Sequence, residues 1–130
     1  MSEENIQTAR KMYSSFNEGD IPTVLSTMDA EIDWTEPGGG DAPSGSFHGP
    51  EAVAQDVFGA VPENFEEFAC NPENFEDQGD DIVMVTGRFK GRNKSGADLD
   101  SAFEHRMAFS GGKVSQFDAK MDEGWAAGWS

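Results

Sequence analysis

The chain is poor in the residues that build disulfides and metal sites. Its 130 residues include one cysteine, Cys70, and two histidines, His48 and His105. A single cysteine excludes an intrachain disulfide, and two distant histidines without a nearby cysteine or aspartate at ligand spacing argue against zinc or iron. Cys70 alternates with Phe68 and is expected to be a small buried apolar residue. The sequence therefore predicts no metal and no cofactor, and His48 is expected to lie in a loop or at a helix entry.

Lysine and arginine are also scarce. There are nine of them against 25 aspartates and glutamates, which gives a formal charge of −16. A field of this sign repels nucleic acid and anionic membrane surfaces, and no basic cluster offers a local exception. We therefore expect neither nucleic acid nor membrane as a partner.

The acidic residues are spread along the chain rather than gathered in one block. This distribution favours adaptation to high salt, as in a halophile, over an acidic patch for a cationic ligand. Salt screens the repulsion between like charges. We therefore expect the melting temperature to rise between low and molar KCl, and an unchanged temperature would contradict the hypothesis.

Long apolar runs and a leader pattern are missing as well. No run approaches the roughly 18 to 20 residues of a membrane span. Residues 1–4 lack the basic and apolar regions of a signal peptide, so the sequence predicts a cytoplasmic protein. The apolar content of 36% still suffices for a core, and one domain over residues 1–130 is expected.

The order of hydrophobic periods predicts three helices and then a meander of strands. Apolar residues recur every three or four positions from Glu3 to Glu18, and Asp20 followed by Pro22 starts a second helix. Alternation from Ile32 to Glu36 predicts a strand. The remaining expected elements are a loop over 37–48, a helix from Pro50, and strands over 65–75, 82–91, 99–110 and 113–121.

Helices first and a long antiparallel meander last indicate the α+β class. Long strands twist, so we expect the antiparallel sheet to curl over the three helices as a half-open cone with an apolar interior. The tail over 122–130 carries Trp125 and Trp129. It is expected to close one end of the cone or to lie in a subunit contact.

Four short segments carry a family resemblance. They are residues 16–20 (FNEGD), 32–37 (IDWTEP), 44–53 (SGSFHGPEAV) and the final hairpin from Phe103 to Asp122. In this order the chain resembles the nuclear-transport-factor-2-like (NTF2-like) superfamily, and within it the SnoaL-like and ketosteroid-isomerase-like proteins, over about residues 3–122. The resemblance implies a cystatin-like α+β barrel and a homodimer. Because this fold hosts isomerases, cyclases, epoxide hydrolases and noncatalytic modules, it does not fix a function.

Glu36 is the first candidate catalytic residue. It shares a strand face with Ile32 and Trp34, so it is expected to face the apolar interior. Desolvation raises the pKa of a carboxylate and makes it a better base near neutral pH. The resemblance places the catalytic carboxylate of ketosteroid isomerases at the same position, directly before a proline. The alternative is a solvated carboxylate at a strand end.

His105 is the second candidate, since it alternates with Phe103 and Met107 on the inward face of its strand. By resemblance it corresponds to the acidic oxyanion donor of ketosteroid isomerases, where SnoaL-like proteins frequently have histidine. Its expected role is to donate a hydrogen bond to a substrate carbonyl or to shuttle a proton. The alternative is a core histidine bonded to the main chain or to Glu36.

Asp122 is the third candidate, because it matches the carboxylate that acts as acid and base in SnoaL-like cyclases. Strand alternation opposes this role: Asp122 shares parity with Asp118 and Lys120 and faces away from Phe117. It reaches the pocket only if a bulge or the end of the strand redirects it.

The first helix departs from the ketosteroid isomerase pattern. The family's tyrosine position corresponds to Met12, which cannot donate a hydrogen bond, and Tyr13 is expected to reach the interior only if the helix turns by about 100°. An epoxide hydrolase needs an Asp–Arg–Asp relay, for which Arg88 and Arg106 form no clear set. The expected pocket wall consists of Met12, Tyr13, Phe16, Trp34, Phe58, Phe103 and Met107.

Two functions remain open at this point. In the first, a small apolar molecule with a carbonyl binds in the cone and is isomerised or cyclised, with Glu36 or Asp122 as base and His105 as donor. In the second, the cone is a noncatalytic ligand-binding or dimerisation module. Convergence of Glu36 and His105 on an open cavity favours the enzyme, whereas a bond between them in a filled core favours the module.

Overall fold

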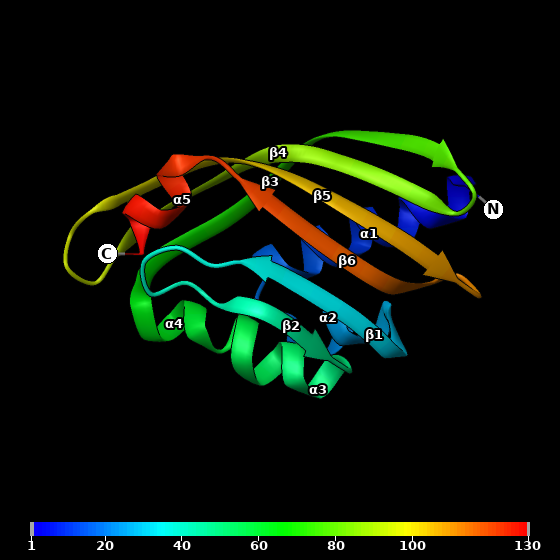
Figure 1. The fold of residues 1–130 in the computed structure, drawn as a ribbon, viewed down its shortest axis with the longest axis horizontal. Coiled ribbons are helices and arrows are strands. Elements are labelled where there is room, and N and C mark those ends of the chain that lie inside the picture. The colour runs from blue at the N-terminus through cyan, green and yellow to red at the C-terminus, as the bar shows by residue number, and fades with distance from the viewer. Residues whose placement is uncertain (1, 130) are drawn as a thin grey trace.

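The computed structural model describes residues 2–129. Its helices are α1 (Ser2–Asn17), α2 (Ile21–Ser26), α3 (Pro50–Ala52), the π-helical segment η1 (Val53–Phe58), α4 (Ala60–Asn64) and α5 (Glu123–Gly128). Its strands are β1 (Met28–Pro37), β2 (Ser44–His48), β3 (Phe65–Gly79), β4 (Ile82–Asn93), β5 (Asp98–Ser110) and β6 (Lys113–Met121). Figure 1 shows them in chain order.

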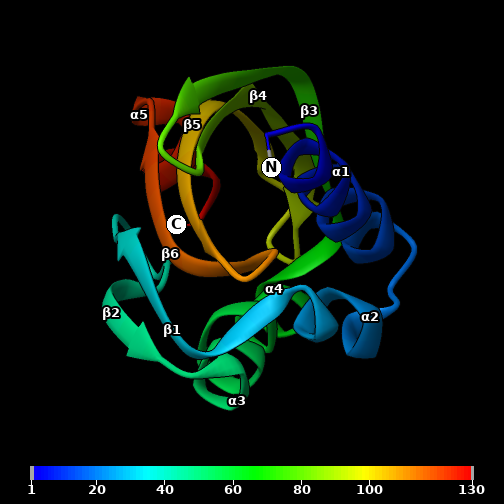
Figure 2. The same cartoon turned by 90° about the vertical axis from the view of Figure 1, so that its right-hand side faces the viewer.

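The described strands form one six-stranded sheet in the order β2-β1-β6-β5-β4-β3. Seen end-on in Figure 2, β3 to β6 curve into an arch, α1 packs beside β3, and α2 to α4 lie across the open side. The long strands supply the twist that this curvature requires. The predicted α+β cone is thus confirmed.

The sheet is not antiparallel throughout, which corrects the expectation. β1 runs parallel to β6, with Trp34 opposite Phe117 and Thr35 opposite Asp118. The other strand pairs are antiparallel. Sequence alternation fixes the face of a residue but carries no information on strand direction, so the pattern of β1 alone did not reveal its partner.

β2 lies where the sequence predicts a loop. Its five residues pair with β1 in antiparallel register, from Asp33 opposite His48 to Pro37 opposite Ser44. The strand is almost entirely exposed and rich in glycine and serine, so it has no alternating pattern. Its conformation comes from the hydrogen-bonding edge that β1 offers rather than from its own propensity.

The third predicted helix is longer and less regular than expected. It begins at Pro50 as predicted, passes through the π-helical segment η1 and continues through Pro62 to Asn64. Val53 and Val57 of η1 are buried. Single π-helical turns are frequent at functional sites, and this one packs Phe58 close to Trp34 of β1, with ring centroids 5.5 Å apart.

The C-terminal tail closes one end of the cone, which is one of the two positions expected for it. Trp125 and Trp129 are 5% and 3% exposed. Asn93 Nδ2 donates to the carbonyl of Gly128 at 2.9 Å, and the amide of Asp41 donates to the carbonyl of Trp129 at 3.2 Å. The backbone at the C-terminal end of α5 is therefore anchored to the end of β4 and to the loop between β1 and β2.

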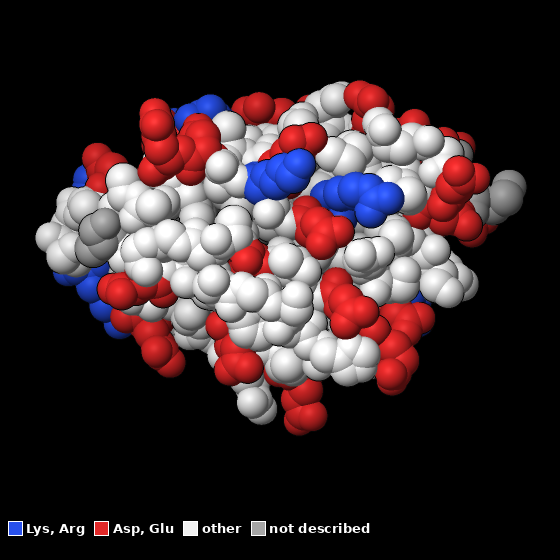
Figure 3. Space-filling model, in the orientation of Figure 1, with Lys and Arg blue, Asp and Glu red and all other residues white. Residues whose placement is uncertain are grey.

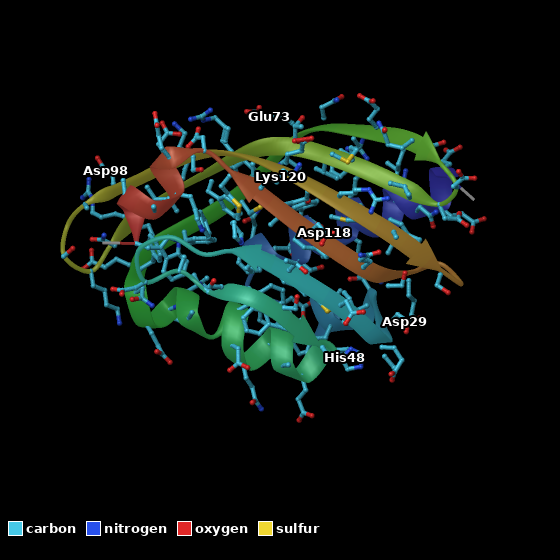
Figure 4. The ribbon with its side chains drawn as sticks, in the orientation of Figure 1. Asp29, His48, Glu73, Asp98, Asp118 and Lys120 are labelled. Carbon is cyan, nitrogen blue, oxygen red and sulfur yellow. The ribbon has the colours of Figure 1, made fainter. Side chains whose placement is uncertain are left out.

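Among the described Asp, Glu, Lys and Arg residues, all but the buried Glu36 have side chains that are exposed or half-buried at the surface. Figure 3 shows carboxylates scattered over the visible face, with few cationic groups among them and no single acidic patch. Asp118 and Lys120 lie on the outer face of β6 (Figure 4). Among the described helices, none is long and apolar enough to cross a bilayer.

Candidate functional site

The interior contains a cavity of about 60 Å³ between the concave face of the sheet and the helices. Its wall is almost wholly apolar and aromatic. The structure places on it five of the residues expected there: Met12, Tyr13, Phe16, Trp34 and Phe58. Glu36 and His105 also line it. The cavity holds more than one water molecule but is small for a ligand site.

Glu36 is a buried carboxylate with one oxygen in use. Its side chain is 7% exposed, and Oε2 accepts a hydrogen bond from Trp34 Nε1 at 2.6 Å. No described residue donates to Oε1. Burial raises the pKa of Glu36 to about 7, against the opposing effect of the Trp34 hydrogen bond. A carboxylate with this pKa is ionised about half of the time at neutral pH, which suits a general base.

His105 does not bond to Glu36 but to Tyr13. His105 Nδ1 and the hydroxyl of Tyr13 lie 2.7 Å apart, and both side chains are buried. Burial lowers the pKa of His105 to about 3 and raises that of Tyr13 well above its ordinary value. Both groups are therefore neutral at physiological pH.

The neutral Tyr13–His105 pair retains one proton for a ligand. Together the two groups carry one O–H and one N–H, and their mutual hydrogen bond uses one of them. Either Tyr13 donates to Nδ1 and Nε2–H remains, or Nδ1–H donates to the phenol oxygen and the O–H remains. Since Tyr13 and His105 both line the cavity, the remaining proton is available to a carbonyl oxygen inside it.

The reach of Tyr13 corrects the expectation for α1. Met12 and Tyr13 are 3% and 4% exposed on the same helix. α1 packs against β3 on one side and α2 on the other, so its buried face is broad enough for neighbouring residues. No rotation of the helix is needed to bring the phenol inside.

This arrangement agrees with the comparison of the chain with known families. A family profile described as a SnoaL-like domain matches residues 9–117. The chain belongs to the SnoaL-like family. A comparison of this SnoaL-like protein with curated proteins finds no significant match.

Solved structures show the same fold. An NTF2-like protein of unknown function from Burkholderia pseudomallei is 27% identical over 92% of this chain and 91% of its own, with a TM-score of 0.84. TerC, co-crystallised with polyporic acid, is 24% identical over 92% of each chain, with a TM-score of 0.81. A putative SnoaL-like polyketide cyclase from Jannaschia is 20% identical over 93% and 87%, with a TM-score of 0.76. At the last two identities the likeness shows the fold alone.

Three residues expected at the site of the SnoaL-like protein lie elsewhere. Phe103 and Met107 are core residues that do not border the cavity; the ring of Phe103 stacks behind His105 with centroids 4.1 Å apart. Asp122 lies outside, where its oxygens accept from the amides of Gly124 at 2.8 Å and Ala102 at 3.0 Å. These hydrogen bonds lower the pKa of Asp122 and make it the N-cap of α5.

Asp122→Asn and Asp122→Ala separate a capping role from a catalytic one. An N-cap carboxylate stabilises the helix it begins, so Asp122→Ala should lower the melting temperature by a few degrees. Asn also caps helices and should lose less. Neither variant should change a proton-transfer rate by more than about twofold at a temperature where both are folded. A loss of about 100-fold would show that Asp122 takes part in catalysis.

The other polar residues weighed in the sequence analysis, His48, Arg88 and Arg106, lie on the surface. His48 ends β2 (Figure 4), exposed, with Nδ1 3.0 Å from Asp33 and Nε2 3.3 Å from Glu31, and these partners raise its pKa. Arg88 and Arg106 pair with outward-facing aspartates of the sheet. No epoxide-hydrolase relay is assembled from these arginines.

Sequence reasoning missed several cavity residues. Pro43, Val57, Val61, Phe68, Cys70, Phe89, Phe117, Trp125 and Trp129 are among those on its wall. Phe117 carried a usable signal, since it faces opposite to Asp122 by strand parity. Pro43 gave none, because it comes from a loop whose packing is decided by the closed sheet. The tail with Trp125 and Trp129 was expected to close one end of the cone or to lie in a subunit contact, but the two tryptophans were not assigned to the cavity wall.

Four of the wall residues also border a groove on the surface. They are Phe16, Phe58, Val61 and Phe68, which line both the cavity and a groove beside Gly19 and Pro62. Phe16 lies 5.4 Å from Phe58 and 5.9 Å from Phe68 between ring centroids. The cavity and the groove therefore share one wall at these four residues.

Proposed function

We propose that this SnoaL-like protein binds a small, largely apolar carbonyl compound and transfers a proton at the carbon next to the carbonyl, as a cofactor-independent isomerase or cyclase. One observation carries the proposal. A buried carboxylate with a pKa of about 7 shares an apolar cavity with a neutral tyrosine–histidine pair that has one proton left to donate.

The proposed step is an enolisation. Oε1 of ionised Glu36 takes a proton from the carbon beside the carbonyl. The electron pair of that C–H bond forms a carbon–carbon double bond, and the π pair of the carbonyl moves onto its oxygen. The proton that remains on the Tyr13–His105 pair forms a hydrogen bond with the developing enolate oxygen. Return of the proton from Glu36 to another carbon gives an isomer, whereas attack of the enolate carbon on a second carbonyl closes a ring.

The separation of the two polar groups supports an enzyme over a filled core. Glu36 bonds Trp34 and His105 bonds Tyr13, so neither neutralises the other. The similar fold of a putative polyketide cyclase and the co-crystallisation of TerC with polyporic acid support an organic ligand for a protein of this fold.

A noncatalytic ligand-binding module is the second candidate. The nearly continuous apolar and aromatic wall of the cavity favours it, because such a wall holds an apolar molecule without assistance from charge. This alternative predicts saturable binding with no proton exchange.

Deuterium exchange tests the proposal. Small cyclic ketones, selected by thermal shift, are incubated in D₂O and their α-hydrogens followed by NMR. The protein-catalysed rate should rise with pH and level off above about pH 7, since Glu36 acts in its ionised form. Tyr13→Phe and His105→Ala should each slow it. Exchange that survives Glu36→Gln, Tyr13→Phe and His105→Ala without change would contradict the mechanism.

A further inference from the structure

Two buried donors at the α5 end of the cavity take no part in the proton transfer above. Trp125 and Trp129 are 5% and 3% exposed and both line the cavity. Within residues 2–129 neither indole Nε1 has a hydrogen-bond partner. Trp34 shows the contrast, since its Nε1 donates to Glu36. An N–H buried without an acceptor loses its hydration and gains nothing in return, so such groups call for an explanation.

Packing alone does not explain these two indoles. The ring of Trp125 lies 4.6 Å from that of Phe89, and the ring of Trp129 lies 4.8 Å from that of Phe65. A phenylalanine, of which the chain has ten, makes such contacts without introducing a donor. α5 is anchored through its backbone carbonyls and its cap, so the indole N–H groups are not needed to hold it.

The two donors belong to one region of the cavity, separate from the Tyr13–His105 pair. The indole rings lie 5.3 Å apart. The ring of Phe89 contacts both Trp125 and His105, with centroids 4.6 Å and 5.9 Å away, whereas no direct ring contact joins either tryptophan to Tyr13 or His105 among the described residues. A trapped water is a poor substitute for a ligand there, because buried waters need two to four polar partners and the neighbouring side chains are aromatic.

We propose that Trp125 and Trp129 form an acceptor-binding subsite, which donates to an uncharged oxygen of the ligand while a carbonyl of the same ligand lies at Tyr13 and His105. This inference rests on the proposed function and specifies its substrate class: an apolar compound with two separated acceptor oxygens, such as a diketone. An uncharged oxygen fits better than a carboxylate, because Glu36 shares the cavity and the chain carries a charge of −16.

The three indole N–H resonances of the full chain report on the subsite directly. They are assigned in ¹⁵N-labelled protein with Trp125→Phe and Trp129→Phe, and Trp34 serves as an internal control that already has its acceptor. Cyclohexane-1,4-dione is the probe, and methylenecyclohexane is an apolar molecule of similar size. The dione should move the Trp125 and Trp129 resonances downfield, and methylenecyclohexane should not. Resonances already at hydrogen-bonded positions and unmoved by the dione would show that water fills the subsite and would overturn the proposal.

Affinity gives a second measurement. One additional hydrogen bond should make the dione bind about fivefold more tightly than cyclohexanone. The Trp125→Phe/Trp129→Phe double variant should bind both ketones equally. Absence of dione binding, or a preference that persists in the double variant, would overturn the subsite. Because these readouts need no turnover, they are repeated in Glu36→Gln. If the dione binds at the subsite but the parent protein catalyses no deuterium exchange, the proposed proton transfer is contradicted and the subsite is not.

Discussion

Glu36→Gln should stabilise the protein while it removes the proposed proton-transfer activity. Glutamine keeps an oxygen that accepts from Trp34 Nε1 but carries no charge into the apolar cavity. Proton transfer should fall at least about 100-fold, since the base is gone. At pH 8 the free energy of unfolding should rise by up to about 3 kcal/mol, the equivalent of the shift in pKa from 4.5 to about 7.

The gain in stability depends on pH in a defined direction. The folded-state pKa of Glu36 is raised, so its favourable contribution is complete below about pH 4.5 and is lost as the pH rises to about 7. The difference between variant and parent should therefore be near zero at pH 4 and largest above pH 7. Chemical denaturation at pH 4, 5.5, 7 and 8 measures it.

His105 imposes the opposite slope, which the same experiment isolates. Burial lowers its pKa from 6.5 to about 3, so stability is lost as the pH falls between these values. In the parent protein the pH dependences of stability from Glu36 and His105 oppose each other over roughly pH 4.5 to 6.5. In Glu36→Gln only the one from His105 remains of these two. Glu104→Gln, an exposed carboxylate next to His105, is the matched control and should change little at any pH. A Glu36→Gln gain that is equal at pH 4 and pH 8 would refute the buried charge.

Phe117→Ala should cause the largest loss of stability among the cavity residues. Phe117 is 1% exposed, stacks on Trp34 with ring centroids 3.6 Å apart and lies 4.6 Å from His105. Removing a buried phenyl ring costs about 3 to 5 kcal/mol, a large part of the stability of a domain this size. Thermal and urea unfolding measure the loss. Phe117→Leu should lose less than half as much stability as Phe117→Ala.

The space left by Phe117 joins the existing cavity, which gives the variant a second signature. Benzene should raise the melting temperature of Phe117→Ala more than that of the parent, because an apolar molecule stabilises the state that binds it. Phe47→Ala, at a half-buried position opposite Trp34 on β2, is the control and should show no such response. A loss below about 1 kcal/mol would mean that Trp34 and its neighbours repack around the gap.

Hydrophobic periods were sufficient to predict most of the regular elements, though not β2 or α5, and the side of the chain that faces inward. The helix over Glu3 to Glu18 and the four C-terminal strands lie close to their predicted positions, and the parity argument that turned Asp122 outward agrees with its place at the cap. Asp20 also caps α2 as expected, accepting from the amide of Thr23. These features are local, so the sequence carries them directly.

Position along a strand was harder to predict than its inward face. Phe103 and Met107 share parity with His105, yet only His105 borders the cavity. Alternation does not tell how far along the strand a cavity extends. The same limit applies to Tyr13, whose partner His105 is 92 positions away, and to the two tryptophans that only the closed cone turns inward.

The parallel pairing of β1 with β6 has a consequence for the order of folding. The strands from β3 to β6 join neighbours along the chain by hairpins, whereas Trp34 meets Phe117 across most of the sequence. Contacts this distant in sequence carry a high loop-closure entropy and form slowly. We therefore expect β1 to dock late, onto a meander that already holds His105. Glu36 would arrive with it, so in a nascent chain the proposed base does not face the proposed donor pair until β6 has left the ribosome.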